Sequence, residues 1–394
     1  MPDLILKRGR EKPVLERHPW IFSGSVAALG GQPLSGETVA VRDHEGNFLA
    51  WAGYSPDSQI RARVWSWDPS ESIGPGFFSD RIARAVHRRN KLNLPGTNAY
   101  RLVHAESDGL PGLIVDRYEN ILVVQFLFVG VEFWRESILD SLESVTQDIF
   151  IFERSDVPVR KLEGLPERKG HLRGSGGEGP VRIMEIGLEM AVDVENGQKT
   201  GYYLDQRDTR ARVREIAEDK NVLDCYCYTG SMALNAVLGG CRLVTAVDSS
   251  ENALTLARHN ADLNKVSGDK IRWIQGDVPT VLRGFRDRAS RFDLIVLDPP
   301  NFAPTSAQAH RAARAYKDIN LLAFKLLAPG GVLVTCSCSG GISPELFQKI
   351  IFSAALDAKV DAQVIGWLHQ GEDHPVSLTF PEGAYLKGLI CRVD

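Results

Sequence analysis

The stretch Val222-Leu223-Asp224-Cys225-Tyr226-Cys227-Tyr228-Thr229-Gly230-Ser231 indicates how the second half of the chain folds. Residues 222–225 form a short apolar run that is typical of a buried strand, and residues 231–238 have the pattern of a helix. Gly230 stands just before that helix, where a glycine allows the backbone to pass close to a ligand. We therefore expect a strand, a turn and a helix, with a binding site at the turn.

The alternation of strands and helices extends over most of the second half of the chain. Further strand-like runs lie at 243–247, 271–274, 294–297 and 332–336, and further helical stretches lie at 207–217, 253–263 and 319–327. Strands that alternate with helices predict a Rossmann-like, doubly wound parallel sheet that is covered on both faces. We assign this domain to residues 186–394. In such a sheet, ligands bind beyond the carboxyl ends of the strands.

Acidic residues stand at or just beyond the ends of the first four of these strands. They are Asp224, Asp248, Asp277 and Asp298. Asp248, at the end of the second strand, is placed to bind ribose hydroxyls. Each aspartate could instead cap the helix that follows it, but four of them in register favour a ligand site. The turn has a single glycine in place of the three of a dinucleotide site, which favours a nucleoside ligand without phosphates.

The first half of the chain has the pattern of two smaller domains. Short strands separated by turns are expected at 38–42, 48–54 and 60–64, which predicts a β-barrel over residues 1–72. Residues 73–185 predict a small mixed α/β domain. Its helices are expected at 77–92 and 132–145, and its strands at 100–104, 113–116, 121–128, 149–153 and 159–162. The charged, Gly-rich stretch 164–179 is expected to be a mobile loop, because its glycines lack the preceding strand and following helix of a phosphate loop.

Composition narrows the class of protein. A chain of 394 residues is long enough for two or three domains, and 43% hydrophobic with 24% charged residues is typical of a soluble globular protein. The net charge of −4 gives no bulk signal for binding a polyanion. We find no apolar run long enough to cross a bilayer and no signal peptide, so we expect the six cysteines to be reduced in the cytoplasm.

Basic residues gather in two places despite the negative total. One group is Lys7, Arg8, Arg10, Lys12 and Arg17, and the other is Arg81, Arg84, Arg88, Arg89 and Lys91. In the second group, positions 81, 84 and 88 share one face of the expected helix. A solvated helix surface is the favoured interpretation of that face, and a nucleic-acid contact is the alternative.

Four segments of the second half resemble motifs I to IV of class I S-adenosylmethionine methyltransferases. They are Asp224–Gly230, Val247-Asp248, Gly276-Asp277-Val278 and Asp298-Pro299-Pro300-Asn301-Phe302. The whole chain is similar to one family, the bacterial large-subunit (23S) ribosomal RNA cytosine carbon-5 methyltransferases. The segments that carry this resemblance are Arg17–Phe22, Ser107–Gly112, Lys199–Asp208, Tyr316–Asn320 and the tail from Asp373 to Val393.

The resemblance implies a domain organisation and a cofactor. Residues 1–72 would be a PUA-like RNA-binding domain, residues 73–185 a small α/β domain of the EEHEE type, and residues 186–394 the class I methyltransferase domain. The cofactor would be S-adenosyl-L-methionine, with ribose at Asp248 and adenine at Asp277 and Val278. The expected cofactor-binding residues are Gln206, Arg207, Asp224, Tyr226, Tyr228, Thr229, Gly230, Asp248, Ser249, Asp277, Val278, Asp298 and Pro299.

The partner implied by the resemblance is large-subunit ribosomal RNA, with no membrane. The residues expected to contact RNA are Lys7, Arg8, Arg10, Arg17 and Trp20. For Trp20, packing in the core of the barrel is the favoured interpretation, and stacking on a base is the alternative. The target base must be flipped out of its stack for its ring atoms to be reached. The sequence allows a homodimer and leaves the oligomeric state open.

Methylation at carbon 5 of cytosine requires a nucleophilic side chain of the enzyme, because carbon 5 is itself a poor nucleophile. A cysteine thiolate that adds to carbon 6 activates carbon 5. Two cysteines follow Gly330-Gly331. By resemblance, Cys338 falls where the nucleophile of the family lies, while Cys336 falls at an ordinary strand position. Protonated Asp298 would hydrogen-bond the edge of the base.

The base that removes the proton from carbon 5 stays unassigned. Tyr316, Lys317 and Asp318 are weak candidates, since Asn301 and Phe302 follow Pro300 where many pyrimidine carbon-5 enzymes carry a second cysteine. The pairs Cys225/Cys227 and Cys336/Cys338 lack the usual spacing of a structural zinc site, so we expect no metal.

Two other functions stay open. A methyltransferase acting on an amino group of guanine would use Asp298-Pro299-Pro300 to orient the amine and would need no cysteine. A non-catalytic RNA-binding or ribosome-assembly factor would keep the fold, but the intact cofactor aspartates count against it.

Overall fold

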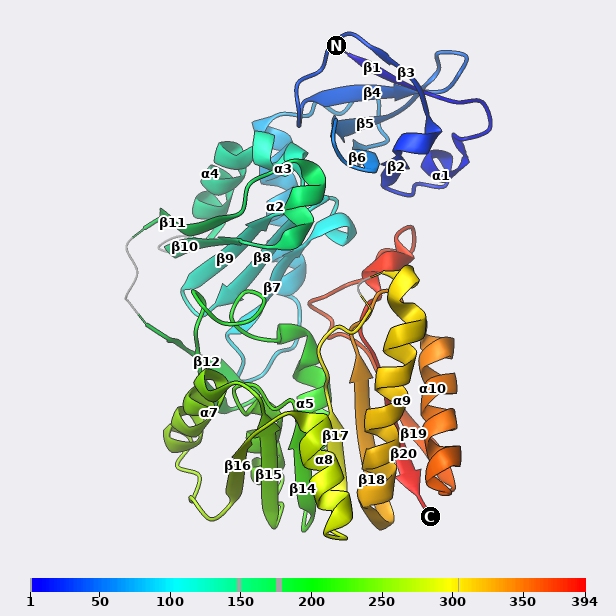
Figure 1. Cartoon of the computed structure of the whole chain (residues 1–394). Coiled ribbons are helices and arrows are strands. Elements are labelled where there is room, and N and C mark those ends of the chain that lie inside the picture. The colour runs from blue at the N-terminus through cyan, green and yellow to red at the C-terminus, as the bar shows by residue number, and fades with distance from the viewer. Residues whose placement is uncertain (1, 147–149, 175–178, 304) are drawn as a thin grey trace. The chain divides into compact units, whose positions relative to one another are not determined.

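The computed structural model describes residues 2–146, 150–174, 179–303 and 305–394. The chain divides into two compact units (Figure 1). The N-terminal unit contains Met1–Ile183, Val192–Leu204 and Glu372–Gly383, and the C-terminal unit contains Met184–Ala191, Asp205–Gly371 and Ala384–Asp394. The N-terminal unit thus includes a segment, Glu372–Gly383, that comes from near the end of the chain.

The first sheet of the N-terminal unit has the strand order β2-β6-β5-β4-β1-β3. Its elements are β1 (Asp3–Leu6), α1 (Lys12–Leu15), β2 (Trp20–Phe22), β3 (Val26–Gly30), β4 (Thr38–Arg42), β5 (Phe48–Tyr54) and β6 (Ile60–Ser66). The three strands expected here are confirmed. The turn between β4 and β5 forms because the Asp43 carboxylate accepts hydrogen bonds from the backbone N–H groups of Glu45 and Asn47 (both 2.9 Å).

A second, five-stranded sheet completes the N-terminal unit, in the order β11-β10-β9-β8-β7. Its elements are α2 (Pro75–Arg89), β7 (Ala99–His104), β8 (Leu113–Tyr118), β9 (Ile121–Phe126), α3 (Val129–Phe133), α4 (Arg135–Thr146), β10 (Phe150–Ser155) and β11 (Arg168–Arg173). The helices and most strands expected for this region are confirmed. Residue 149 of the strand expected at 149–153 lies outside the described residues.

Two expectations for this region are wrong. Residues 159–162, expected as a strand, lie in a 3-10 helix, Pro158–Glu163. This helix forms where Arg160 and Glu163 are buried with partners: Arg160 Nε donates to the Pro166 carbonyl (2.7 Å), and Glu163 Oε1 accepts from Arg63 Nη1 (2.8 Å). Within the stretch 164–179, expected as a loop, β11 pairs antiparallel with β10, while residues 175–178 are outside the described part of the chain.

The C-terminal unit is built around a seven-stranded sheet in the order β16-β15-β14-β17-β18-β20-β19. Its strands are β14 (Asn221–Cys225), β15 (Leu243–Asp248), β16 (Ile271–Gln275), β17 (Phe292–Leu297), β18 (Leu327–Ser337), β19 (Ala362–Leu368) and β20 (Lys387–Val393). The strands β14 to β18 are parallel, and β20 runs antiparallel to both β18 and β19. A two-stranded ribbon of β12 (Val181–Glu185) and β13 (Leu188–Val192) precedes it in the chain.

Helices alternate with the parallel strands, as the sequence pattern predicts, beginning with α5 before β14. They are α5 (Arg207–Ile216), α6 (Ser231–Leu238), α7 (Glu251–Leu263), α8 (Val278–Asp287), α9 (Ala309–Leu326) and α10 (Pro344–Ala358). The helices α8, α9 and α10 pack next to one another (Figure 1), and their apolar side chains join one core with those of the sheet. The Rossmann-like fold is therefore confirmed. The helix expected at 319–327 begins earlier, at Ala309.

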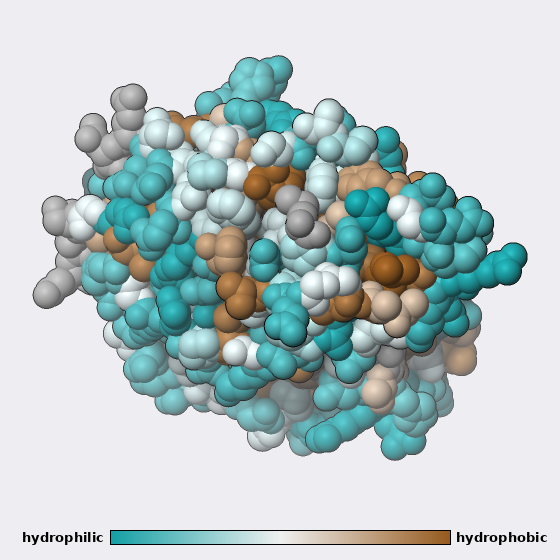
Figure 2. Space-filling model, turned by 90° about the horizontal axis from the view of Figure 1, so that it is seen from above, coloured by the Kyte–Doolittle hydropathy of each residue, from teal (hydrophilic) through white to brown (hydrophobic). Residues whose placement is uncertain are grey.

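The face of the molecule that Figure 2 shows is mainly polar. In the view of Figure 2, most residues are hydrophilic or intermediate, and the hydrophobic ones form small groups. Among the described residues, no helix is both long and apolar enough to span a membrane.

Candidate active site

The candidate site lies at the carboxyl ends of the parallel strands in the C-terminal unit. The chain runs from β14 outward to β16 and then returns to the other side of β14 as β17. Such a reversal of strand order opens a crevice between the loops that follow the two central strands, β14 and β17. Those loops begin at Tyr226 and Asp298.

The turn after β14 is shaped by residues with left-handed backbone conformations. Tyr226, Tyr228 and Gly230 have φ values of 62°, 49° and 82°. A Cβ atom at Gly230 would lie 2.8 Å from Trp273 Cη2, so both the conformation and the space require glycine there. The backbone N–H of Tyr228 donates to Asp248 Oδ2 (2.9 Å), which ties the turn to the end of β15.

Three of the predicted aspartates lie close enough to influence one another. Asp224 is buried, and burial raises its pKa well above the ordinary value, with the charges of Asp298 and Asp248 adding to the effect. The Gln206 amide Nε2 donates to Asp298 Oδ1 (2.8 Å). Two further oxygens, Asp224 Oδ2 and Gln206 Oε1, are buried and have no hydrogen-bond partner among the residues described.

These features fit S-adenosylmethionine. A cluster of carboxylates lowers the energy of a cationic ligand, and this cofactor carries a sulfonium and an amino group. Buried polar atoms normally have partners, so the open oxygens of Asp224 and Gln206 suit ligand donors. The Asp248 carboxylate lies where ribose hydroxyls are expected, although it also accepts from the backbone N–H of Ser250 (2.9 Å).

The other expected cofactor residues lie at the same edge of the sheet or just beside it. Asp277 caps the N-terminus of α8: its Oδ2 accepts hydrogen bonds from the Thr280 N–H (3.1 Å) and hydroxyl (2.7 Å). This oxygen therefore has the helix-capping role that was the alternative to ligand binding. Ser249 is exposed, whereas Arg207, Thr229, Val278 and Pro299 are buried. Burial also raises the pKa of the half-buried Tyr226.

Cys338 is the accessible cysteine of the predicted pair. It follows the last residue of β18 and is half-buried, whereas Cys225, Cys227, Cys241, Cys336 and Cys391 are buried. Burial raises the pKa of the Cys336 thiol well above its usual value, which disfavours the reactive thiolate there. The two residues that flank Cys338 are held by one phenol: the hydroxyls of Ser337 and Ser339 each bond the Tyr316 hydroxyl at 2.9 Å.

The three candidates for the general base have different surroundings. Tyr316 is buried beside Cys338, and burial raises its pKa. Lys317 is ion-paired with Asp357 (2.7 Å), and Asp318 is ion-paired with Arg283 (2.5 Å). Of the three, only Tyr316 is linked to the residues around Cys338.

Sequence reasoning did not single out Lys387. The strand β20 places it opposite Ser337 of β18, and its Nζ donates to the Ser339 carbonyl (2.7 Å). Burial lowers the pKa of Lys387 to about 8, and the charge of Cys338 acts in the opposite direction. The sequence did contain a sign that Lys387 has a specific role: it stands in the otherwise apolar run Leu386–Cys391. A charged residue is rarely buried without a partner.

The residues expected to bind RNA lie in the first sheet of the N-terminal unit or beside it. Lys7, Arg8, Arg10 and Arg17 are exposed. Trp20 does not belong to the apolar core of this sheet, contrary to the favoured interpretation. Its indole N–H donates to Glu106 Oε1 (2.7 Å), and its ring packs edge-on against Phe380, with the centroids 4.8 Å apart.

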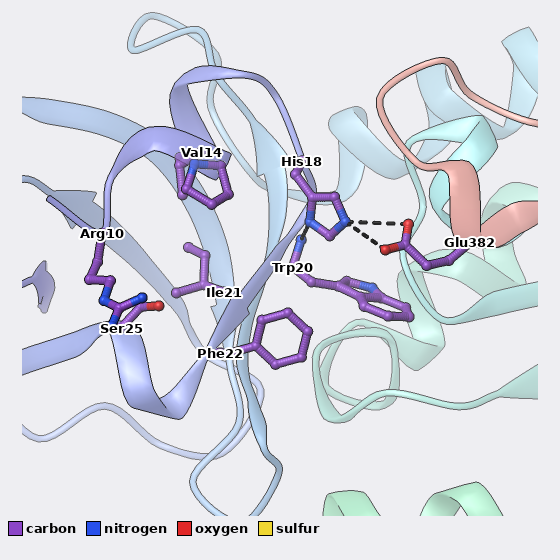
Figure 3. A pocket seen from close by; sticks show the side chains of 9 residues that line it. Arg10, Val14, His18, Trp20, Ile21, Phe22, Ser25 and Glu382 are labelled. Carbon is purple, nitrogen blue, oxygen red and sulfur yellow. Dashed lines mark hydrogen bonds and ion pairs between the residues drawn. The ribbon is translucent and has the colours of Figure 1, made fainter. Parts of the chain in front are cut away.

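A cavity of about 220 Å³ lies beside Trp20 (Figure 3). It is lined by Arg10, His18, Trp20, Phe22 and Glu382, among others, and the His18 ring faces the Glu382 carboxylate at 3.3 Å. Phe22 is 49% exposed. One expected basic residue and several aromatic rings therefore share one pocket.

The second basic group has mainly structural partners. Arg81 is ion-paired with Glu71 (3.2 Å), and both Arg88 and the buried Arg89 bond Asp108. This agrees with a helix surface more than with a free nucleic-acid contact. Within the described residues, no group of three or more His, Cys, Asp or Glu side chains could hold a metal ion.

Comparisons with known proteins show the class of enzyme to which the chain belongs. Residues 4–67 match the family model of a PUA-like domain, and residues 172–364 match that of an S-adenosylmethionine-dependent methyltransferase. A solved methyltransferase complexed with SAH has a TM-score of 0.87 and 21% identity, with all of both chains covered. A SAM-dependent methyltransferase structure from Streptococcus mutans has a TM-score of 0.85 and 20% identity, which shows a shared fold. The fold and site are those of an enzyme that uses S-adenosylmethionine as cofactor.

Curated relatives then define the family. The chain is 49% identical to the ribosomal RNA large subunit methyltransferase I of Escherichia coli (strain SMS-3-5 / SECEC), over 99% of both chains. It is also 49% identical to the protein of that name from Klebsiella pneumoniae (strain 342), over 100% of this chain and 98% of that one. The chain therefore belongs to the ribosomal RNA large subunit methyltransferase I family.

Proposed function

We propose that the protein methylates carbon 5 of a cytosine in 23S ribosomal RNA through a covalent adduct with Cys338. The names of the full-length relatives give ribosomal RNA as the substrate of those enzymes. The observation that carries the choice of chemistry is the half-exposed Cys338 just after β18, in a chain whose other cysteines are buried. With ribosomal RNA as its substrate, we expect the protein in the cytoplasm.

In this proposal the chain's own residues hold the cofactor at the ends of β14 and β15. Asp248 would bind the ribose hydroxyls, the turn from Asp224 to Gly230 would line the methionine end, and Val278 would contact the adenine. S-adenosylmethionine supplies the methyl group as an activated sulfonium. The carboxyl groups of Asp224 and Asp248 would orient the cationic end of the cofactor in the crevice.

Cys338 and Asp298 would act on the base itself. The sulfur lone pair of Cys338 would form a bond to carbon 6, and Asp298 in its protonated form would donate to ring nitrogen 3, which takes up the displaced electron pair. Carbon 5 would then form a bond to the methyl group, whose bond to the cofactor sulfur breaks and leaves a neutral thioether, and nitrogen 3 would return its proton to Asp298. Carbon 5 would afterwards lose its own proton to a base that stays unassigned. The sulfur–carbon 6 bond breaks in the same elimination and returns the thiolate.

The PUA-like domain would contact the RNA outside the target base. Lys7, Arg8, Arg10 and Arg17 are exposed cations that can bind phosphates. The half-buried Trp20 and the exposed Phe22 border the pocket of Figure 3, where an unpaired base could stack. Neutralising the four cations should weaken RNA binding and reduce its dependence on salt.

Covalent trapping tests the proposed chemistry. Large-subunit RNA that carries 5-fluorocytosine is incubated with the cofactor and with wild type, Cys338→Ala or Cys336→Ala, and the products are resolved on denaturing gels. A fluorine at carbon 5 cannot leave as a proton does, so wild type and Cys336→Ala should accumulate a protein–RNA adduct that Cys338→Ala does not form. If no variant forms an adduct while methyl groups still enter unmodified RNA, amino methylation of guanine replaces the proposal. Failure to bind the cofactor would instead favour a non-catalytic RNA-binding factor.

A further inference from the structure

Lys387 is a buried lysine placed directly beside the loop that carries Cys338. The antiparallel pairing of β20 with β18 sets Lys387 opposite Ser337, one residue before Cys338. Its ammonium group donates to the carbonyl of Ser339, one residue after Cys338, at 2.7 Å. Lys387 is 6% exposed, so its position is fixed by the sheet and by this hydrogen bond.

The charge of Lys387 has one partner. Among the residues that the structure describes, the charged group that acts on its ammonium is Cys338, and no carboxylate contributes. A buried cation without a counter-ion is costly. A thiolate at Cys338 would offset this cost, and the ammonium would in turn favour the thiolate over the thiol.

We propose that Lys387 is a positioning residue that holds Cys338 in its thiolate form through an ion pair. This proposal rests on the proposed carbon-5 function, since it concerns the nucleophile of that reaction. It also supplies a role for the buried lysine that neither the family resemblance nor the expected cofactor site explains.

Three other titratable groups lie near Cys338 in the described part of the chain, and none of the three is a cation. Asp298, which follows β17, brings no positive charge: in its protonated form it is neutral, and in its ionised form it raises the pKa of the neighbouring Cys336 thiol. From α9, the Tyr316 hydroxyl is engaged by Ser337 and Ser339, and from β18 the buried Cys336 thiol is held neutral. Lys387, in contrast, is a cation on the neighbouring strand, and its charge and that of Cys338 act on each other.

The charge on the Cys338 sulfur changes during the reaction, while the Lys387 ammonium stays protonated. Before RNA binds, the Cys338 proton leaves to solvent and the ammonium of Lys387 stays protonated. When the sulfur lone pair forms the bond to carbon 6, the negative charge leaves the sulfur and Lys387 loses its counter-ion. The elimination that breaks this bond returns the thiolate to its partner, so the pair is restored at the end of each cycle.

The pH dependence of thiol alkylation tests the pair without RNA or cofactor. The full-length protein is treated with iodoacetamide over about pH 5.5 to 10, where thiolates but not thiols react, and the modified peptides are quantified by mass spectrometry. In wild type, the rate at Cys338 should reach half its plateau well below the ordinary thiol pKa of about 8.5. In Lys387→Met this midpoint should rise by about one pH unit, so that the rate falls about tenfold at pH values well below the wild-type midpoint.

Controls separate the pair from a structural effect. Lys387→Arg keeps the cation and should keep a low midpoint, whereas Lys325→Met removes an exposed lysine of α9 and should change nothing. Protection of the buried Cys336 and Cys225 in every variant reports that the sheet is intact, and Lys387→Gln replaces Lys387→Met if that protection is lost. A wild-type midpoint at or above about 8.5, or equal midpoints in wild type and Lys387→Met, would overturn the ion pair. These readings are independent of the RNA adduct, so failure of the trapping experiment alone would refute the carbon-5 chemistry and not the pair.

Discussion

Replacing Gly230 by alanine should destabilise the C-terminal unit and its cofactor site together. Gly230 caps the N-terminus of α6 with φ 82° and ψ 12°. A residue with a Cβ atom costs about 1–2 kcal/mol in this left-handed conformation. The added methyl group would also lie 2.8 Å from Trp273 Cη2 and 3.1 Å from Ala257 Cβ, and such overpacking costs a further 1–3 kcal/mol, roughly. We expect the free energy of unfolding to fall by about 2–5 kcal/mol.

Gly240 provides a matched control near the other end of α6. It has the same φ of 82°, but a Cβ atom there would meet only Glu218 Cγ at 3.9 Å. Gly240→Ala should therefore lose only the conformational contribution of about 1–2 kcal/mol. Urea unfolding followed by circular dichroism measures both losses, and the transition that shifts on adding S-adenosylmethionine identifies the C-terminal unit.

Cofactor affinity is the second measurement on the same two variants. Gly230→Ala should bind S-adenosylmethionine more weakly, because the shifted backbone moves the Tyr228–Asp248 hydrogen bond, while Gly240→Ala should bind as wild type does. Equal losses of stability in the two variants, with equal cofactor affinity, would refute the argument that the contact with Trp273 makes glycine necessary.

Two further predictions concern buried charges in the C-terminal unit. The folded-state pKa of Asp224 is raised, so the stability this carboxyl contributes is fully present below its unfolded pKa and is lost as the pH rises through the folded value. Asp224→Asn should consequently gain stability relative to wild type in urea unfolding as the pH is raised, and a difference that stays constant between about pH 5 and 8 would contradict the raised pKa. Glu185→Gln should lower the free energy of unfolding by about 3–5 kcal/mol, because it leaves Arg210 buried without its bidentate carboxylate (2.5 and 2.7 Å). Glu215→Gln is the control, because it breaks an exposed ion pair with Arg212 in α5, the helix that also carries Arg210. It should lower the free energy of unfolding by less than about 1 kcal/mol. Similar losses from Glu185→Gln and Glu215→Gln would show that burial does not determine the contribution of these ion pairs.

The parallel part of the Rossmann-like sheet could be predicted because its strands are buried on both faces. Apolar runs such as 294–297, or 222–225 with Asp224 as its single polar residue, are visible in a local window of sequence. The edge strand β19 has mostly exposed side chains and does not show that pattern. The strand β20 is buried and apolar from residue 388 to 391, but Lys387 at its start interrupts the longer run, and this strand was not predicted. In α8, Pro279 and Gly284 interrupt the apparent helical signal, although a proline is acceptable in the first turn of a helix.

The site could be predicted where its residues lie at strand ends, and not where it depends on pairing between distant strands. The turn after β14 and the acidic residues at the strand ends were visible as motifs. The approach of Lys387 to Cys338 depends on the register of β20 against β18, which joins residues about fifty positions apart. Residues 159–162 show the same limit, since burial of Arg160 with its partners outweighed local strand propensity.

Tritium release tests the central claim, methylation at carbon 5, most directly. Large-subunit RNA labelled with tritium at carbon 5 of its cytosines is incubated with the protein and S-adenosylmethionine, and tritium in water is compared with methyl groups in RNA. We predict one tritium released for each methyl group incorporated by wild type, and neither event with Cys338→Ala. Methyl incorporation with all tritium retained in the RNA would contradict the account, because it would place the methyl group on another atom.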